Sequence, residues 1–559
     1  MSSFFAVVVL SLLLTVSAES SQGQHIDFSH FQFPEPQTEL PVFSLGPSVQ
    51  FPWAAVKDIV LATAKKQEDF KEVDIGNGTA LVSDDRVAAR LDRATGETIV
   101  FPRLSDLKPG SQFSFDAAKE YLDQGSVFPP DDTQISPVQG QSIFNAAIDR
   151  SGNQMNVTKP GVFLSNIYVQ RNITAGAAQY SVCGPGSKGS FTVDSTGKVV
   201  SVSHRWRSAK KSGSGLKALP KSNIQDAILT QLAKAQIANA TVDNLELCYY
   251  DSGKSYIQPV YRFLATPGTT LAGIDVQRIV GYVPAVEGPP EQVPDLIRTE
   301  GASNPGQAPL SGSQSGPSNL RRQSGAPVGF VRYIMQNDDN VPLWLQDSQD
   351  FLNGLNIGSA MANFFCVLGL KFCSGLDNEQ YFWSEQRFFT NENDFFVDSA
   401  PLAYQENHGS NHFFCTDTNA QGCGGVSITS IPSSGYGDGQ NRLRYWINRA
   451  CSFIPGPADM DIVKAADPWW NVFDGLHVAL GFRVTSWCRD GTTFPIGLNA
   501  ALGVGMVSSW MSTVNDAAWY QGLPHGAASA IAVCGHSDDT LYDRQDIGRA
   551  NCLEFWYVS

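Results

Sequence analysis

A histidine and a cysteine that lie 43 positions apart are the residues of this chain best suited to chemistry. Each follows a short apolar run: DFFVDSAPLAYQENHG places His408 before Gly409, and NRLRYWINRAC ends on Cys451. A free thiol has a pKa of about 8.5 and is mostly protonated at neutral pH, so it needs a neighbouring imidazole to become a good nucleophile. Neighbouring strands that end at these two residues would supply that pair. The pattern therefore predicts a thiol nucleophile, Cys451, with His408 as its general base.

Groups that would support this chemistry lie nearby in the sequence. We expect the backbone amide of Gly409 to stabilise an oxyanion, because glycine allows a tight turn and a backbone amide needs no particular side chain. Asp338 and Asp339 follow the apolar run VGFVRYIM and are predicted to line a pocket for a basic substrate group. A second candidate pair, His525 and Cys534, is too close in sequence for a crossover between adjacent parallel strands.

Other common catalytic motifs are missing from the sequence. There is no G-x-S-x-G elbow, no H-E-x-x-H zinc helix and no Walker phosphate loop. Cys534-Gly535-His536 has no second pair of ligands at zinc spacing, so we expect no metal and no cofactor.

The two sites resemble those of the caspase and legumain clan of cysteine peptidases, in which one apolar strand leads into His-Gly and another leads into Ala-Cys. The matching residues here are His408-Gly409 and Ala450-Cys451. The resemblance implies a cysteine-type endopeptidase, or a transpeptidase if an amine replaces water, acting on a peptide or protein substrate. Arg449 stands where caspases have Gln and legumains have Glu, so the resemblance leaves substrate preference open.

A later segment, WWNVFDGLHVALGF at residues 469–482, is similar to a poorly characterised family of bacterial and fungal proteins with a caspase-like domain. This likeness covers residues 329–559. It implies an α/β domain with a mainly parallel sheet covered by helices on both faces, as buried apolar runs such as LRYWI also indicate.

The chain divides at a segment rich in Gly, Pro, Ser and Gln. Residues 284–328 offer no apolar periodicity, so we interpret them as a flexible linker between an N-terminal region, residues 19–283, and the caspase-like domain. The linker contains Arg321-Arg322, a candidate site for a processing protease. Cleavage there is expected to release the C-terminal half.

The N-terminal region alternates apolar and polar residues in two blocks, residues 190–209 and 245–266, each with a polar turn at its centre. Between them, Ile224, Ile228, Leu229 and Leu232 have the spacing of a short amphipathic helix. These α+β blocks resemble the propeptide modules of secreted metallopeptidases. The resemblance implies that this half inhibits or chaperones the C-terminal domain, which makes the protein a zymogen.

Several features indicate a secreted glycoprotein. Residues 1–18 resemble a signal peptide, although its positive n-region is missing, and no later apolar run is long enough for a membrane anchor. Glycosylation sequons occur in the N-terminal half, at Asn77, Asn156, Asn172 and Asn239. The net charge of −15 argues against nucleic-acid binding, which needs clustered Lys and Arg.

The ten cysteines set a condition on the proposed nucleophile. Cys183 and Cys248 are the two of the N-terminal half and are expected to pair, and Cys415 and Cys423 look like a local pair. Eight cysteines follow the linker, so a free Cys451 requires a second unpaired cysteine there. Two alternatives stay open: a non-catalytic secreted binding protein, with Cys451 bridged to Cys488 or Cys534, and a tailoring enzyme of a secreted natural product.

Overall fold

The computed structural model describes most of the chain from residue 24 to residue 559. Segments outside the description are residues 1–23, 35–37, 64–69, 152–153, 269–270, 272, 299–327, 337, 363–375, 418–421, 440–441 and 524–526. The predicted signal peptide, the dibasic pair Arg321-Arg322 and the candidate base His525 therefore lie outside the described residues.

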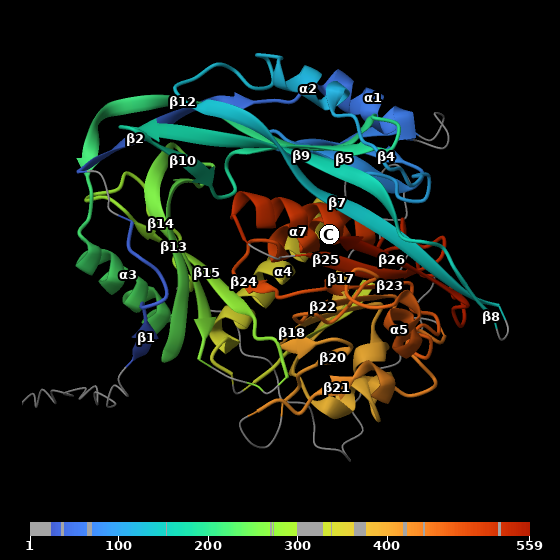
Figure 1. Cartoon of the computed structure of the whole chain (residues 1–559). Coiled ribbons are helices and arrows are strands. Elements are labelled where there is room, and N and C mark those ends of the chain that lie inside the picture. Colours follow the sequence, from blue (N-terminus) through green and yellow to red (C-terminus); the bar gives the residue numbers. More distant parts are fainter. Residues whose placement is uncertain are drawn as a thin grey trace, which may run out of the picture.

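Long, mostly antiparallel strands build the N-terminal half (Figure 1). Its strands are β1 (His25–Asp27), β2 (Glu39–Val49), β3 (Lys71–Asp74), β4 (Gly78–Ser83), β5 (Arg86–Asp92), β6 (Thr98–Val100), β7 (Gln134–Ser151), β8 (Gln154–Val157), β9 (Gly161–Ala175), β10 (Ala178–Cys183), β11 (Lys188–Asp194), β12 (Val199–Lys217), β13 (Asn239–Asp251), β14 (Tyr256–Pro267) and β15 (Arg278–Pro284). Its helices are α1 (Trp53–Thr63), α2 (Asp116–Leu122) and α3 (Lys221–Lys234).

The two alternating blocks of the N-terminal region form hairpins, as their pattern predicts. The first block is the antiparallel pair β11 and β12, and the second is the pair β13 and β14. Helix α3 lies between them in sequence and buries Ile224, Ile228 and Leu232 against the face of β14 and β15, while Leu229 is half-buried. The expected bond between Cys183 and Cys248 is present and joins the parallel neighbours β10 and β13.

A mainly parallel sheet organises the C-terminal half. Its parallel strands lie in the order β17 (Leu376–Trp383), β16 (Val328–Ile334), β18 (Leu402–Glu406), β22 (Tyr445–Arg449) and β23 (Val478–Phe482). Two antiparallel strands continue the sheet, β25 (Ala528–Val533) and β26 (Cys552–Val558). Every residue of β18, β22 and β23 is buried. This explains why β23 and the first three residues of β18 and β22 are apolar without alternation, whereas the last two residues of β18 and β22 are buried polar or charged side chains.

Different kinds of structure cover the two faces of this sheet. One face packs against the helices α4 (Val341–Ala362), α6 (Thr493–Ala501) and α7 (Met506–Tyr520). The other face packs against side chains of short elements: aromatic ones from η4 (Gln386–Phe389) and η8 (Asp467–Trp469), and aliphatic ones from η6 (Val397–Ser399) and α5 (Ile462–Ala466). The short helix η5 (Asn393–Phe395) lies between η4 and η6 in the sequence. The fold is thus mixed α/β with a large sheet core, and regular α-helices gather mainly on one face.

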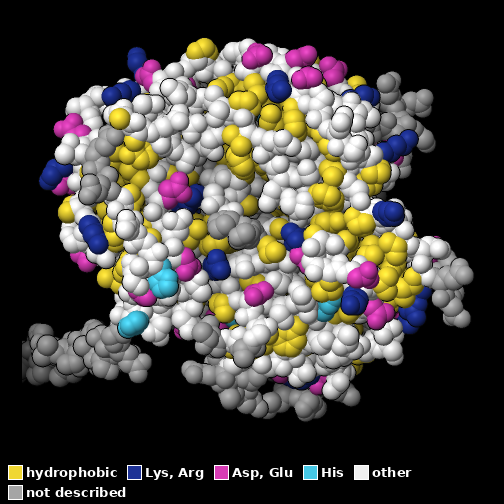
Figure 2. Space-filling model, viewed as in Figure 1, with side chains coloured by type: hydrophobic (Ala, Val, Ile, Leu, Met, Phe, Trp, Pro, Cys, Tyr) yellow, Lys and Arg dark blue, Asp and Glu magenta, His cyan; other side chains and the backbone are white. Residues whose placement is uncertain are grey.

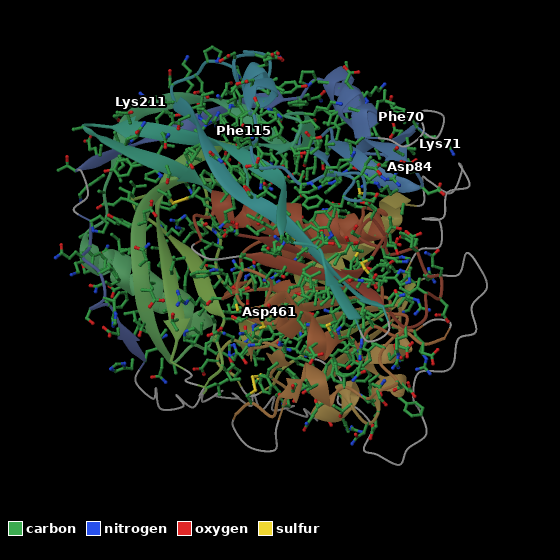
Figure 3. All side chains as sticks on the ribbon, turned by 45° about the vertical axis from the view of Figure 1, so that its right-hand side comes forward. Phe70, Lys71, Asp84, Phe115, Lys211 and Asp461 are labelled. Atoms are coloured by element: carbon green, nitrogen blue, oxygen red, sulfur yellow. A yellow bond between two sulfur atoms is a disulfide. The ribbon has the colours of Figure 1, made fainter. Side chains whose placement is uncertain are left out.

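The two halves of the chain share one hydrogen-bonded sheet network. Strand β26 of the C-terminal half pairs with β7 of the N-terminal half, from Cys552 opposite Asp149 to Val558 opposite Ile143. Strand β15 also pairs with β24 (Trp487–Cys488). In Figures 1 and 3, β7 and β9 run across the C-terminal body.

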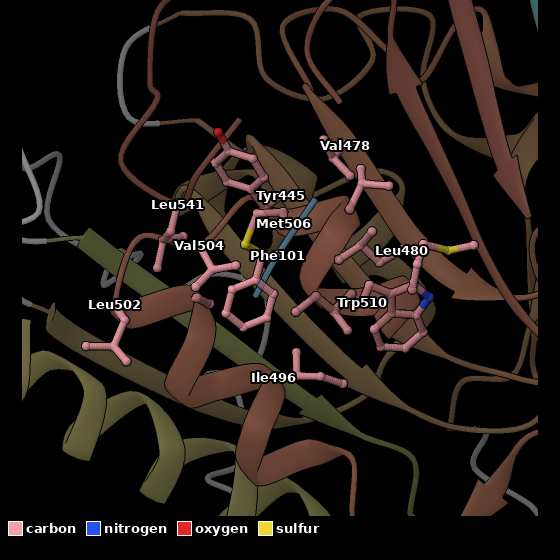
Figure 4. Packing of buried hydrophobic residues seen from close by; sticks show 14 of the residues in the cluster. Phe101, Tyr445, Val478, Leu480, Ile496, Leu502, Val504, Met506, Trp510 and Leu541 are labelled. Carbon is pink, nitrogen blue, oxygen red and sulfur yellow. The ribbon is translucent and has the colours of Figure 1, made fainter. Parts of the chain in front are cut away.

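The cores of the two halves interlock as well. Phe101, which follows β6, lies among Val504, Met506 and other apolar side chains of the C-terminal half (Figure 4). Burying a side chain of this size contributes about 1.5–3 kcal/mol relative to leaving it exposed. The boundary drawn from the sequence therefore does not coincide with a break in the sheet or in the core.

The first part of the predicted linker is packed rather than extended into solvent. Residues 284–298 are described, and among them Val286, Val293 and Leu296 are buried. Glu291 accepts hydrogen bonds from the backbone N–H groups of Ser255 and Tyr256. The rest of the linker that precedes β16 lies outside the described residues.

The surface carries charges of both signs. On the face shown in Figure 2, Lys and Arg side chains are scattered among Asp and Glu rather than gathered in one basic patch. Within the described part of the chain, no helix combines the length and the apolar character needed to cross a membrane.

Candidate active site

His408 and Cys451 lie at matching positions beyond two adjacent parallel strands. Strand β18 pairs with β22 so that Glu406 stands opposite Arg449, and each candidate residue follows two positions later. Carboxyl ends of parallel strands meet at one edge of a sheet, so the two residues share that edge. Both are fully buried.

The turn that follows His408 packs directly against the turn that contains Cys451. A Cβ atom on Gly409 would lie 2.7 Å from the Cβ of Ala450 and 2.9 Å from the carbonyl oxygen of Cys451. The φ angle of Gly409 is not positive, so glycine is needed here for close approach and not for a left-handed turn. His-Gly and Ala-Cys are therefore in contact through their backbones.

A small sheet and a disulfide hold the His408 turn in place. The sheet comprises β19 (Gly409–Ser410), β20 (Phe413–Phe414) and β21 (Val426–Ser427). The N–H of Cys415 donates to the carbonyl of His408 at 2.9 Å, and Cys415 forms the expected bond with Cys423. This arrangement gives the Cys415–Cys423 bridge a role in fixing the histidine backbone.

Both ring nitrogens of His408 have partners. The backbone N–H of Gln277 donates to Nδ1 at 3.1 Å, and Nε2 lies 3.0 Å from Oδ2 of Asp338. Because a backbone N–H can only donate, Nδ1 is the acceptor and Nε2 carries the proton that Asp338 accepts. The ring of Trp344 packs edge-on against the imidazole at 4.9 Å.

Asp338 differs from the sequence expectation that it lines an open substrate pocket. Its side chain is only 2% exposed, and its second oxygen accepts the backbone N–H of Asn340. The carboxylate therefore orients the His408 ring, which is the arrangement that the third group has in catalytic triads. Asp339 is half-buried in the turn that precedes α4.

Cys451 is a reduced thiol in a closed environment. Its Sγ accepts the backbone N–H of Ser486 at 3.3 Å and lies 3.4 Å from the Ser486 hydroxyl. Burial raises the pKa of this thiol to about 11, and the two contacts with Ser486 lower it only in part. The thiol is therefore protonated at neutral pH in this conformation.

The cysteine pairing meets the condition that a free Cys451 sets. Cys488 is the second free cysteine of the described C-terminal residues. Cys534 is bonded to Cys552, which excludes it as a nucleophile and as a partner for Cys451. The disulfides are visible as yellow bonds in Figure 3. Cys366 and Cys373 lie outside the described residues.

A segment of the N-terminal half crosses this edge of the sheet, just before β15. The N–H of Asp275 donates to the carbonyl of Gly409 at 2.9 Å, and its carboxylate accepts the hydroxyl of Ser452 at 2.6 Å. The N–H of Arg278 donates to the carbonyl of Ser486 at 3.2 Å. The segment thus touches the turn after His408, the residue after Cys451 and the serine that contacts its Sγ.

Gln277 is the centre of this crossing segment and is fully buried. Besides its bond to His408, its side-chain amide donates to the carbonyl of Arg449. Its Oε1 accepts from Trp344 Nε1 at 2.6 Å and from the Cys488 thiol at 3.0 Å. A single glutamine therefore connects both strand ends of the site.

A buried ion network lies below the site. The guanidinium of Arg449 lies 2.9 Å from Glu406 and 3.1 Å from Asp490, and Thr492 and the Trp487 carbonyl also accept from it. Burial raises the pKa of Glu406 to about 8 against the opposing effect of Arg449. Burial would lower the pKa of Arg449, but acidic neighbours, Asp490 foremost, keep it well above its usual range. Arg449 is therefore held inside the protein and does not point toward a substrate.

The remaining predicted residues lie away from this edge. Asn77, Asn156 and Asn239 are exposed, while Asn172 is half-buried and its side chain donates to Ser136 at 3.4 Å. His412, a neighbour of His408 in sequence, bonds the carbonyl of Ala465 at 3.0 Å and is not part of the site.

Sequence reasoning did not find Gln277, Ser486 or the pairing of Asp338 with His408. Gln277 and Ser486 lie in stretches of mixed polar and apolar residues, DVQRIV and RVTSWC, with no motif to mark them. Comparison with known proteins adds no further residues, because neither the protein-family models nor the curated proteins include a match to this chain.

Proposed function

We propose that the protein is a secreted, glycosylated cysteine hydrolase of the caspase-like type, made as a latent proenzyme. The observation that carries the proposal is the matched placement of His408 and Cys451 beyond adjacent parallel strands, with Gly409 packed against Cys451. The disulfides support an oxidising compartment, because such bonds persist mainly in exported proteins. The resemblance of the His-Gly and Ala-Cys sites to the caspase and legumain clan supports a peptide substrate.

In the proposed reaction the thiolate of Cys451 attacks a peptide carbonyl carbon, and a tetrahedral intermediate forms. His408 takes the thiol proton at Nδ1 and gives it to the leaving amine as the C–N bond breaks. Asp338, which accepts the Nε2 proton, stabilises the imidazolium that exists between these steps. Water, or an amine in transpeptidation, then attacks the thioester and releases Cys451.

The backbone amide of Gly409 is the proposed oxyanion donor. The packing of Gly409 against Ala450 and the carbonyl of Cys451 supports this choice. Asp338 is better suited to hold His408 than to bind substrate, because its carboxylate is buried on the imidazole.

The described conformation fits the latent state. Gln277 donates to the nitrogen that His408 needs as a base, and the buried Cys451 thiol has a raised pKa. We propose that the segment around Gln277 inhibits the enzyme and that cleavage at Arg321-Arg322 allows it to move. The N-terminal half is then an inhibitory region, in line with its resemblance to propeptide modules.

The test is peptide cleavage by the secreted protein after limited proteolysis of its linker. Cys451→Ala should reduce turnover at least about 10³-fold, as loss of a nucleophile does in triad enzymes. Cys488→Ala is the matched control, because Cys488 is also free and buried and should retain activity within about threefold. Equal activity of Cys451→Ala and wild type would refute the proposal.

A second candidate is a binding protein that keeps the scaffold without catalysis. The complete burial of Cys451 and its raised pKa favour this alternative. Iodoacetamide distinguishes the two after linker cleavage: a nucleophile becomes alkylated at neutral pH, whereas a structural thiol stays protected.

A further inference from the structure

A second cluster of chemically active side chains lies at the other end of the strands of the C-terminal sheet, opposite the end that carries His408 and Cys451. His477 immediately precedes β23, at the amino end of a strand parallel to β18 and β22, whereas His408 and Cys451 follow carboxyl ends. His536 and Asp539 come from the loop after β25. This cluster of His477, His536 and Asp539 is therefore separate from the candidate active site.

The three side chains converge on one oxygen atom. Nδ1 of His477 lies 2.6 Å from Oδ2 of Asp539, and Nδ1 of His536 lies 2.8 Å from the same oxygen. The two imidazole rings are 5.0 Å apart, and the possible ligand atoms all lie within 4.8 Å of one another. His477 is fully buried, while His536 and Asp539 are partly exposed.

The protonation of the His477 ring indicates which species lies between its Nδ1 and the Asp539 carboxylate. Nε2 of His477 lies 2.9 Å from the backbone carbonyl of Gln545, which can only accept, so Nε2 carries a proton. In the neutral imidazole Nδ1 then presents a lone pair to a carboxylate oxygen. Two acceptors at this distance need a positive species between them, either a second proton on the ring or a metal ion.

We infer that His477, His536 and Asp539 bind a divalent zinc ion through Nδ1, Nδ1 and a carboxylate oxygen. Two imidazoles and one carboxylate form a common zinc donor set, with water as the fourth ligand. The bond from Nε2 of His477 to the Gln545 carbonyl is the outer contact that typically fixes a metal-binding histidine. Zinc bonds of about 2.0–2.1 Å place neighbouring ligand atoms about 3.3 Å apart. From their present distances of 2.6 and 2.8 Å to Asp539, His477 and His536 must therefore move back by about 0.7 and 0.5 Å.

The position of the site indicates a structural zinc that holds the two halves together. The loop that carries His536 and Asp539 is anchored by the Cys534–Cys552 bond. In the same loop Asp538 accepts the backbone N–H groups of Leu104 and Ser105, from the N-terminal half, at 2.7 and 2.9 Å. A zinc ion would fix this loop to the start of β23 and so stabilise the contact between halves.

Metal content and spectroscopy test the inference on the full-length secreted protein. After loading with Zn²⁺ and exhaustive dialysis, we expect one equivalent of bound zinc per protein molecule, measured by inductively coupled plasma mass spectrometry. Co²⁺ in its place should give the visible absorption of a tetrahedral site. Zinc should raise Tm by about 3 °C or more over the chelated protein.

Variants locate the ion. His536→Ala and Asp539→Asn should each lower bound zinc at least tenfold and remove the cobalt spectrum. His30→Ala is the matched control, because His30 is an exposed histidine that also lies beside a carboxylate, Asp27; it should keep the full equivalent. Less than a tenth of an equivalent in wild type, or zinc that both variants retain, would overturn the inference in favour of a protonated His477.

Discussion

The backbone N–H of Gln277 donates a hydrogen bond to Nδ1 of His408, with 3.1 Å between the two nitrogens. Gln277 belongs to the N-terminal half, and His408 is the candidate base of the C-terminal half. The nitrogen that would accept the Cys451 proton is therefore engaged by another part of the same chain. Under the proposed function, the conformation of residues 275–278 is the variable that separates a latent site from an active one.

Release of Gln277 should expose the thiol. Gln277→Ala removes the side-chain bonds to Arg449, Trp344 and Cys488, although its backbone N–H remains. We expect iodoacetamide to label Cys451 at least about tenfold faster at pH 8, because reactivity follows access and thiolate content. Peptide mass spectrometry after timed labelling measures the rate. Gln258→Ala, a buried glutamine that bonds Glu291 instead, is the control and should not change it.

Alkylation of Cys451 should depend on pH in a way that reports its burial. In the intact protein the rate should rise toward a midpoint near pH 11, because burial raises the pKa of this thiol to about 11. In the unfolded chain the thiol ionises at about pH 8.5, so its contribution to the free energy of unfolding is complete below that pH. The contribution is lost as pH rises toward 11, because the unfolded chain then gains from ionisation that the folded protein resists. Linker cleavage should move the midpoint toward neutral pH. A midpoint near 8.5 in the uncleaved protein would contradict the closed environment.

Substitution of Gly409 should disturb the contact between the two turns. Gly409→Ala places a Cβ 2.7 Å from that of Ala450, and we expect a loss of about 1–3 kcal/mol in the free energy of unfolding. Urea unfolding measures the loss, and peptide cleavage should fall in parallel. Gly125→Ala is the control, because its Cβ would meet only a Pro130 carbon at 3.8 Å. Equal stability of the two variants would show that the turns are not in close contact.

The buried network around Arg449 should respond unequally to substitution of its two acidic residues, Asp490 and Glu406. Asp490→Asn leaves the Arg449 charge without its main partner and should cost about 3–5 kcal/mol at pH 6. Glu406→Gln should cost less than about 1 kcal/mol there, because burial raises the pKa of Glu406 to about 8 and its carboxyl is mostly neutral.

The same pKa gives Glu406 a characteristic pH dependence. The pKa of Glu406 is higher in the folded protein than in the unfolded chain, so protonation of this side chain favours the folded state. This contribution to the free energy of unfolding is complete below about pH 4.5 and is lost as pH rises through 8. Wild type should therefore lose more stability between pH 6 and pH 9 than Glu406→Gln does, as chemical denaturation at both pH values would measure. An identical loss in both proteins would assign the pH dependence to other groups.

Local patterns in the sequence predicted the local structure well. The alternating blocks became β11–β12 and β13–β14, and the spacing of Ile224, Ile228 and Leu232 became the buried face of α3. Two pairings followed from cysteine placement, Cys183 with Cys248 and Cys415 with Cys423. The hairpins and the helix depend on residues that are close in sequence, and each disulfide had few other cysteines available as partners.

Long-range contacts could not be predicted in the same way. Gln277 reaches His408 only because β15 lies beside β24, a pairing between distant segments that no local period encodes. His477 and His536 meet because β23 and β25 are antiparallel neighbours, whereas their spacing in sequence matches no zinc motif. The sequence predicted that Asp338 follows a strand and lines a substrate pocket. Its bond to His408 could not be predicted, because it depends on the position of β18 next to β16.

The pairing of β26 with β7 changes what linker cleavage can accomplish. If the C-terminal half separated after cleavage, as the sequence predicts, the backbone hydrogen bonds between β7 and residues 552–558 of β26 would break. Each fragment would then have an unpaired edge strand. A nicked molecule should therefore persist as a non-covalent heterodimer whose two polypeptides co-elute and separate only in denaturant. Maturation would then be a rearrangement within a two-chain enzyme, and the N-terminal polypeptide would remain as a permanent subunit.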